Sequence, residues 1–190
     1  MAKRKIPEFL TAEEQEKLLS IFNVRYFNSF RNRTMIKLFL ASGLRLSEMI
    51  NLRGRDINLM TGQLKVVEGK GAKDRILWIS DSIVKELRLW KEKQSGKLGI
   101  CELVFTSNSK KKLDDRNIRK MVYQYSSKAG INKNVSPHTF RHTYASDLLR
   151  ATKNIRLVQK ALGHEDLSTT MIYTHIVDEE FEIALKVFRD

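Results

Sequence analysis

The chain has 190 residues, 42% of them hydrophobic, which is enough to build the core of one globular domain or of a small domain with an appendage. Its 35 Lys and Arg residues exceed its 22 Asp and Glu residues, and the resulting net charge of +13 favours a polyanionic partner, with nucleic acid as the first candidate. No secretory signal, 18-residue apolar run or pair of cysteines is present, so we expect a cytoplasmic protein without membrane spans or disulfides.

The charge is distributed unevenly along the chain. Residues 1–160 carry 33 basic and 15 acidic side chains, whereas residues 161–190 carry 2 and 7. A basic excess can also serve only to keep a protein soluble, so the choice of partner depends on the motifs.

Helical patterns dominate the first fifty residues. Thr11 and Glu14 form a capping box that predicts a helix over about 11–22. Apolar residues then recur at helical spacing until Gly43, which predicts a second helix that ends there. A third helix is expected to begin at Ser47, which is an acceptable N-cap residue.

Residues 63–79 change to a period of two around a turn-like segment, 69–74, which predicts a β-hairpin with Lys70 near its tip. Residues 103–106 are expected to add a short edge strand. With helices before and after, the fold class is mainly α with a small antiparallel β-sheet (α+β).

The second half returns to helical periodicity from residue 81, with loops expected at 95–99 and 107–112. The pair Ser136-Pro137 is a strong helix start. Another capped helix is expected over 154–163. No internal repeat or long linker divides the chain, so we expect one domain.

Four side chains near the C-terminal end suggest phosphoryl chemistry. His138 and Arg141 lie three apart beside a helix N-terminus and can face one anion. His164 follows a helix that ends at Gly163, and Tyr173 comes nine residues later. Two imidazoles, a guanidinium and a phenol can hold and attack a phosphodiester without a metal. Taken singly, each also fits an ordinary role as a surface, capping or core residue.

The chain resembles the tyrosine recombinase (phage integrase) family, most closely its Xer-like members, over about residues 8–180. The motifs that carry the resemblance are G-L-R-L-S-E at 43–48, G-K-G at 69–71, H-T-F-R-H at 138–142, L-G-H at 162–164 and I-Y-T-H at 172–175. Their order and separations are also those of the family. The resemblance implies the family's catalytic-domain fold and a site-specific recombinase that cuts and rejoins DNA through a 3′-phosphotyrosyl bond.

Seven residues receive roles from the resemblance: Tyr173 as nucleophile, Arg45 and Arg141 as phosphate clamp, Lys70 as leaving-group acid, His138 and His164 in the pocket, and Glu48 in support of Arg45. The assignments agree with the chemistry. A phenol with a pKa near 10 is only about one part in a thousand ionised at pH 7, so its attack needs cations that stabilise the phosphorane. Lys73 competes with Lys70 for the role of acid, and we favour Lys70. Of two further histidines in the motifs, we interpret His142 as structural and His175 as peripheral.

Double-stranded DNA is the expected partner, and no metal or cofactor is expected. The candidate DNA-binding residues are basic: Lys73, Lys110, Lys111, Lys112, Arg116, Arg119 and Lys120. A solvated basic loop and helix would look the same in sequence. The apolar and acidic segment 179–190 is expected to dock on protein. The resemblance implies docking in trans within a DNA-bound homo-tetramer, and docking on its own domain is the alternative.

Other function classes are weaker. His138 and His142 have the spacing of a zinc-hydrolase helix, but position 139 is Thr and no third carboxylate ligand is evident. Position 64, where a P-loop would need glycine before Gly69-Lys70, is Leu. Two alternatives share the expected fold: a DNA-binding regulator without the chemistry, and a type IB topoisomerase-like enzyme that relaxes supercoils.

The chain departs from the family pattern at its N-terminal end. Family members commonly carry a helical core-binding domain of about a hundred residues before the catalytic domain, whereas Thr11 here already begins the catalytic pattern. We therefore expect a single catalytic domain over 1–190 without that clamp domain, either as a naturally minimal recombinase or as a shortened form. Integration, excision, inversion and dimer resolution all remain compatible with these motifs.

Overall fold

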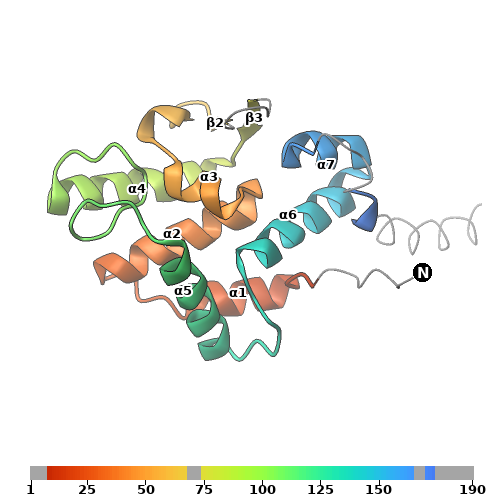
Figure 1. The fold of residues 1–190 in the computed structure, drawn as a ribbon, viewed down its shortest axis with the longest axis horizontal. Coiled ribbons are helices and arrows are strands. Elements are labelled where there is room, and N and C mark those ends of the chain that lie inside the picture. The colour runs from red at the N-terminus through yellow and green to blue at the C-terminus, as the bar shows by residue number, and fades with distance from the viewer. Residues whose placement is uncertain (1–7, 68–73, 165–169, 174–190) are drawn as a thin grey trace, which may run out of the picture.

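The computed structural model describes residues 8–67, 74–164 and 170–173 (Figure 1). Its helices are α1 (Ala12–Ser20), α2 (Phe27–Ser42), α3 (Leu46–Asn51), α4 (Asp81–Leu98), α5 (Asp115–Lys128), α6 (Pro137–Thr152) and α7 (Ile155–Leu162), with 3-10 turns η1 (Gly54–Asp56) and η3 (Met171–Tyr173). Its strands are β1 (Ile57–Asn58), β2 (Gln63–Val66) and β3 (Arg75–Trp78). The expected class, mainly α with a small antiparallel sheet, is confirmed.

Local capping chemistry sets most helix ends. Thr11 and Glu14 make the predicted capping box, in which the Glu14 carboxylate accepts from the Thr11 backbone N–H at 2.8 Å. Ser136 caps α6, with Pro137 in its first turn, and Asn154 caps α7. The C-terminal ends of α2 and α7 are also confirmed, because Gly43 and Gly163 both adopt the left-handed conformation.

The start of α3 differs from the prediction. Its N-cap residue is Arg45, not Ser47, because Glu48 accepts the Arg45 backbone N–H through Oε2 at 2.7 Å. The Glu48 carboxylate in the first turn of α3 thus binds the N–H of the N-cap residue, and no serine hydroxyl caps this helix.

The sheet has the order β1-β2-β3 and is antiparallel throughout, with Leu64 opposite Leu77 in the predicted hairpin. Strand β1 was not predicted. Residues 103–106 form only isolated bridges, Arg53 to Leu103 and Thr106 to Lys112, so the expected edge strand is wrong. The loop expected at 95–99 is also wrong in part, because α4 continues to Leu98.

Helix α2 lies between α4 and α6 and forms the centre of the main core (Figure 1). Phe39 of α2 packs against Phe140 of α6, with ring centroids 5.9 Å apart. Further along α6 a second, smaller cluster begins. Its members are Ala145, Leu149, Val158, Leu162 and Tyr173. Helix α6 thus connects the main core to the small cluster that contains the tyrosine.

None of the helices in the described ranges combines the length and the apolar character that a membrane crossing requires.

The end of α2 generates a stability prediction. Gly43 has φ +60°, and a Cβ there would lie 2.3 Å from Cδ1 of Tyr144. We expect Gly43→Ala to lower the free energy of unfolding by about 2–4 kcal/mol, from the left-handed backbone and the clash together. Urea denaturation measures the change.

Gly96→Ala is the matched control for this substitution. Gly96 lies in α4, and a Cβ there meets no atom within 4 Å. Helix propensity alone should then raise stability by about 0.5–1 kcal/mol. Equal effects at the two glycines would contradict the argument from backbone conformation.

Candidate active site

Arg141 occupies the centre of the candidate site. It lies in α6, its exposed fraction is only 6%, and its guanidinium donates to the carbonyl oxygens of Gly43 and Leu162, both at 2.6 Å. These carbonyls belong to the C-terminal ends of α2 and α7, where the helix dipole favours a cation. Burial, followed by the charge of Arg45, lowers the pKa of Arg141 to about 10. The side chain is still protonated at neutral pH.

His164 contacts the same guanidinium. Its Nε2 lies 3.1 Å from Nη2 of Arg141, and its Nδ1 lies 3.0 Å from Oγ1 of Thr170. Because arginine can only donate, Nε2 must accept and the proton is assigned to Nδ1, which donates to Thr170. Burial and the neighbouring arginines, Arg141 first, lower the pKa of His164 to about 4. The imidazole is therefore neutral at pH 7.

Arg45 and Glu48 form a second arm of the site, at the start of α3. Nη1 of Arg45 donates to Oε1 of Glu48 at 3.0 Å. The Arg45 side chain keeps 37% of its surface exposed, whereas Glu48 keeps 8%. Buried Glu48 thus holds a partly exposed guanidinium at the edge of the site.

Tyr173 is buried in the second cluster, with an exposed fraction of 2%. Its hydroxyl lies 2.5 Å from Nδ1 of His142. Burial raises the pKa of Tyr173 to about 12, although the charge of Arg141 acts in the opposite direction. Burial lowers the pKa of His142, so its neutral ring is suited to accept a hydrogen bond from the phenol hydroxyl. In this arrangement the phenol is protonated and shielded from solvent.

His138 lies at the N-terminal end of α6 and is exposed. Partial desolvation, followed by the charges of Arg119 and Arg141, lowers its pKa. Arg119 comes from α5, so a basic side chain of that helix reaches the neighbourhood of the site.

The structure brings together most of the residues selected from sequence. Arg45 is hydrogen-bonded to Glu48, and Arg141 is hydrogen-bonded to His164. The charges of Arg45, Glu48 and Tyr173 shift the pKa of Arg141. Lys70 and Lys73 lie in residues 68–73, which are outside the described residues. The same is true of His175 and of segment 179–190.

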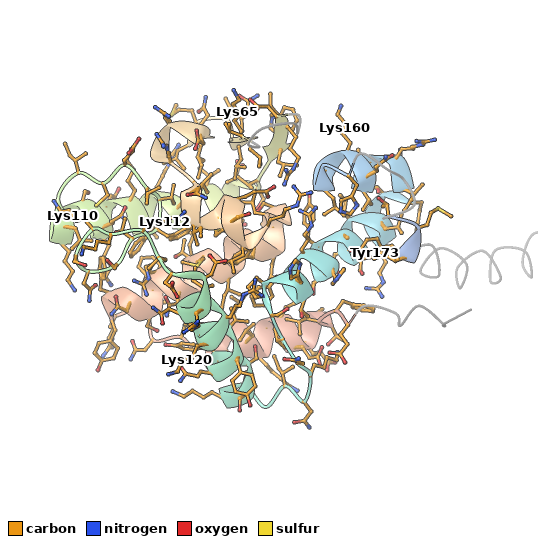
Figure 2. The ribbon with its side chains drawn as sticks, viewed as in Figure 1. Lys65, Lys110, Lys112, Lys120, Lys160 and Tyr173 are labelled. Atoms are coloured by element: carbon orange, nitrogen blue, oxygen red, sulfur yellow. The ribbon has the colours of Figure 1, made fainter. Side chains whose placement is uncertain are left out.

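The other candidate DNA-binding residues are all exposed, and they are Lys110, Lys111, Lys112, Arg116, Arg119 and Lys120. Figure 2 shows Lys110 near the end of the view opposite Tyr173, Lys112 closer to the centre, and Lys120 below them. These basic side chains thus come from α5 and from the loop before it.

Sequence reasoning missed two parts of the site. Arg75 of β3 is buried and forms two hydrogen bonds with Glu48, at 2.9 and 2.8 Å. His142 was interpreted as structural, yet it contacts the Tyr173 hydroxyl. For Arg75 the available signal was an arginine inside an apolar strand. For His142 it was a second histidine beside the H-x-x-R motif.

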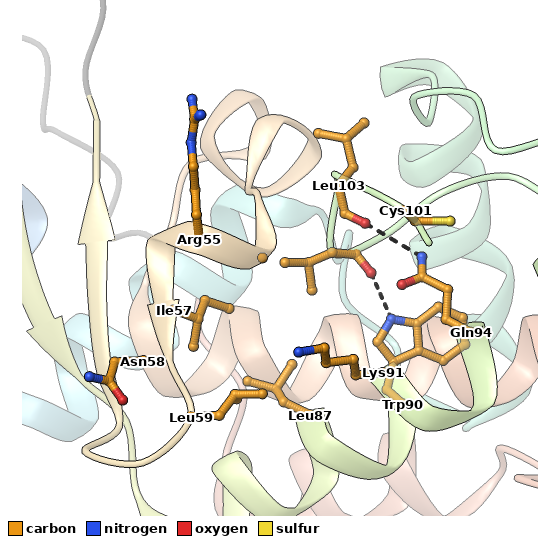
Figure 3. A pocket seen from close by; sticks show the side chains of 12 residues that line it. Arg55, Ile57, Asn58, Leu59, Leu87, Trp90, Lys91, Gln94, Cys101 and Leu103 are labelled. Carbon is orange, nitrogen blue, oxygen red and sulfur yellow. Dashed lines mark hydrogen bonds between the residues drawn. The ribbon is translucent and has the colours of Figure 1, made fainter. Parts of the chain in front are cut away.

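A separate hollow of about 440 Å³ lies between η1, β1, α4 and the loop that follows Gly99 (Figure 3). Trp90 and Leu87 line it, and Trp90 donates to the Val104 carbonyl at 2.7 Å. None of its lining residues was selected from the sequence. Within the described ranges, no group of three or more His, Cys, Asp or Glu side chains is arranged to hold a metal ion.

Comparisons with known proteins agree with this geometry. Residues 8–180 match the phage integrase family. A tyrosine recombinase of Thermosipho africanus is 39% identical over 97% of this chain and 62% of its own length. Tyrosine recombinase XerD of Staphylococcus saprophyticus is 39% identical over 91% of this chain and 59% of its own length. The chain therefore spans about 60% of the length of these curated relatives.

Solved structures show the same similarity. The crystal structure of XerA recombinase has a TM-score of 0.84 at 30% identity and covers 99% of this chain and 67% of that chain. XerH recombinase, in a post-cleavage complex with palindromic difH substrate, has a TM-score of 0.81 at 29% identity, over 98% of this chain and 54% of that chain. The catalytic domain of bacteriophage HP1 integrase shares the fold, with a TM-score of 0.66 at 22% identity over 95% of each chain.

The lowered pKa of His164 predicts a loss of stability in mild acid. The imidazole titrates near 6.5 when unfolded and at about 4 when folded, so the folded state resists protonation. Its contribution is fully present above pH 6.5 and is lost as the pH falls toward 4. We expect a loss of about 1–2 kcal/mol between pH 7 and 5, after discounting for solvent screening of this half-buried ring.

Urea unfolding at pH 7, 6 and 5 tests this with His164→Asn as comparison. The variant should lose less stability over the same range, although His138 and His142, whose pKa values are also lowered, keep part of the dependence. Identical pH profiles for the two proteins would show that His164 is not responsible.

Proposed function

The chain belongs to the phage integrase family, and we propose that it is a tyrosine-type site-specific recombinase, an enzyme that cuts and rejoins DNA through a 3′-phosphotyrosyl intermediate. The observation that carries the proposal is the position of Arg141, which contacts His164 and interacts electrostatically with Arg45 and Tyr173. Two arginines and a histidine would thus share one bound phosphate, and Tyr173 lies in the neighbouring cluster, close enough to affect Arg141 electrostatically. We also propose that residues 1–190 form a single catalytic domain.

In the proposed reaction, the Tyr173 oxygen attacks the phosphorus of a DNA phosphodiester while the 5′ oxygen leaves. The phenol proton passes to a neutral histidine of the site as the P–O bond to tyrosine forms. The bond from phosphorus to the 5′ oxygen breaks, and that oxygen takes a proton from an acid, to which we assign Lys70. Arg45 and Arg141 stabilise the extra negative charge on the phosphorane. The 3′-phosphotyrosyl bond conserves the phosphodiester energy, so the reverse attack by a 5′ hydroxyl rejoins DNA without ATP.

Tyr173 must leave its buried position before it can attack. Its ring is almost fully enclosed and its hydroxyl is bonded to His142. A phosphate held by Arg45 and Arg141 would place the reacting phosphorus beside these arginines, so the phenol has to move toward it. We therefore assign the observed arrangement to a resting state that DNA binding converts.

The proposed substrate is double-stranded DNA, and the proposed location is the cytoplasm. The similar XerH site-specific recombinase, at 29% identity, was solved with its palindromic difH substrate, which supports this choice. For this protein, the exposed cations of α5 and of the loop before it would contact phosphates. A homo-tetramer on DNA, with segment 179–190 docked on a neighbouring subunit, is the proposed assembly.

The decisive experiment traps the covalent intermediate. A nicked suicide substrate that carries the cognate site should give a denaturation-resistant protein–DNA adduct, and Tyr173→Phe should abolish it while leaving DNA binding unchanged. Arg45→Lys should slow adduct formation by about 10²–10³-fold, because lysine cannot replace a bidentate donor to the phosphorane. Good binding without an adduct in the parent protein would favour the non-catalytic regulator.

A substrate with a 5′-bridging sulfur separates the acid from the clamp, since a thiolate leaves without a proton. It should restore the activity of Lys70→Ala and leave Arg45→Lys slow. Rescue of Lys73→Ala in place of Lys70→Ala would transfer the role of acid to Lys73. Relaxation of supercoils without exchange between two sites would indicate a topoisomerase.

Salt dependence tests the proposed phosphate contacts. Each contact contributes a slope of about −0.9 to the plot of log affinity against log salt concentration. Replacing Arg116, Arg119 and Lys120 of α5 by Ala should therefore flatten the slope by about 2–3. Lys85, exposed on α4 and outside the proposed contact set, supplies the control substitution. Equal slopes for the triple variant and the parent protein would remove α5 from the DNA interface.

A further inference from the structure

Arg75 forms hydrogen bonds to two other elements of the fold, α7 and α3, and its bonds to α3 include an ion pair with Glu48. It is the first residue of β3, it is 93% buried, and its Nη1 and Nη2 donate to Oε1 and Oε2 of Glu48 at 2.9 and 2.8 Å. Its Nε donates to the carbonyl oxygen of Ala161 at 3.0 Å. One guanidinium therefore joins the sheet to α3 and to α7. With so little exposed surface, it is poorly placed to contact DNA itself.

The carboxylate that Arg75 holds is the one that fixes Arg45. Oε2 of Glu48 accepts the Arg45 backbone N–H, and Oε1 accepts the Arg45 guanidinium. Both Glu48 oxygens are thus shared between Arg45 and Arg75. A bidentate pair sets the plane of the carboxylate, and that plane sets the direction in which Arg45 can be held.

The other contact of Arg75, with the Ala161 carbonyl, lies on the histidine side of the site. Ala161 and Leu162 are the last two residues of α7, and their carbonyls accept from Arg75 and Arg141 respectively. Two buried cations thus bind the C-terminal end of one helix, where the dipole favours them. The chain then turns at Gly163 and presents His164 to Arg141.

We infer that Arg75 is a positioning residue, which sets the distance between Arg45 and His164 by binding Glu48 with one edge of its guanidinium and α7 with another. This inference depends on the proposed function, because it concerns the geometry of that same site. A lysine at position 75 keeps the charge but cannot make both contacts at once.

Single-turnover adduct formation with saturating suicide DNA tests this role. Arg75→Lys should bind DNA as the parent protein does and should form the adduct about 100-fold more slowly, the cost expected for a displacement of about 1 Å at a reacting site. Substrate with a 5′-bridging sulfur should not rescue it, since the defect lies in the clamp. Rescue, or an unchanged rate, would overturn the inference.

The matched control is Arg33→Lys, which alters another Arg–Glu pair between two elements, Arg33 of α2 with Glu86 of α4. This variant should keep the parent rate, and assays below the melting temperature of both variants remove stability effects. Arg75→Gln is a second variant in case lysine is not tolerated. A comparable slowing in Arg33→Lys would indicate general loosening of the fold, which would also overturn the inference.

Two further measurements isolate the path through Glu48. In a double-mutant cycle, Arg75→Lys should slow the Glu48→Gln variant far less than it slows the parent protein. Independent of catalysis, hydrogen exchange at the Arg45 amide should accelerate in Arg75→Lys and not in Arg33→Lys. A parent protein without adduct would refute the proposed function alone, whereas unchanged exchange at Arg45 would refute the positioning role.

Discussion

A buried guanidinium determines the arrangement of the whole site. The Arg141 guanidinium donates to backbone carbonyls at the C-terminal ends of α2 and α7. Each of these carbonyls lies two residues before a residue of the site. Gly43 precedes Arg45, and Leu162 precedes His164. Because a buried cation is very unfavourable without acceptors, α2, α6 and α7 can pack only where both carbonyls reach Arg141. The charge that would bind phosphate thus also fixes the residues around it.

Sequence predicted the parts of the fold that depend on neighbours in the chain. The caps at Thr11, Ser136 and Asn154 and the glycines that end α2 and α7 follow from local chemistry, and all were confirmed. The start of α3 was not predictable in this way. It depends on Glu48, whose orientation is set by an arginine 27 residues further along the chain.

The same distinction applies to the site. The family resemblance singled out Arg45, Arg141, His164 and Tyr173. In the structure, His164 contacts Arg141, and Arg45 and Tyr173 affect it electrostatically. Arg75 was not identified because three apolar residues, Ile76, Leu77 and Trp78, follow it in the strand. In an uninterrupted apolar run, the alternation of side chains does not show which face of the strand is buried. Ile76 and Trp78 turn out to be exposed, at 47% and 67%, and Arg75 shares the inner face with Leu77.

The burial of Tyr173 has a consequence for selectivity. Transferring a large side chain out of an apolar cluster costs about 1.5–3 kcal/mol, which would keep the tyrosine exposed in only about one molecule in ten to one in a hundred and fifty. In the proposed reaction, the DNA to be cut would therefore have to supply this free energy from its own contacts. Random duplex that is held only by diffuse charge offers less of it than a cognate site. The apolar cluster that encloses Tyr173 would then prevent cleavage of DNA that binds only weakly, which is most of a chromosome.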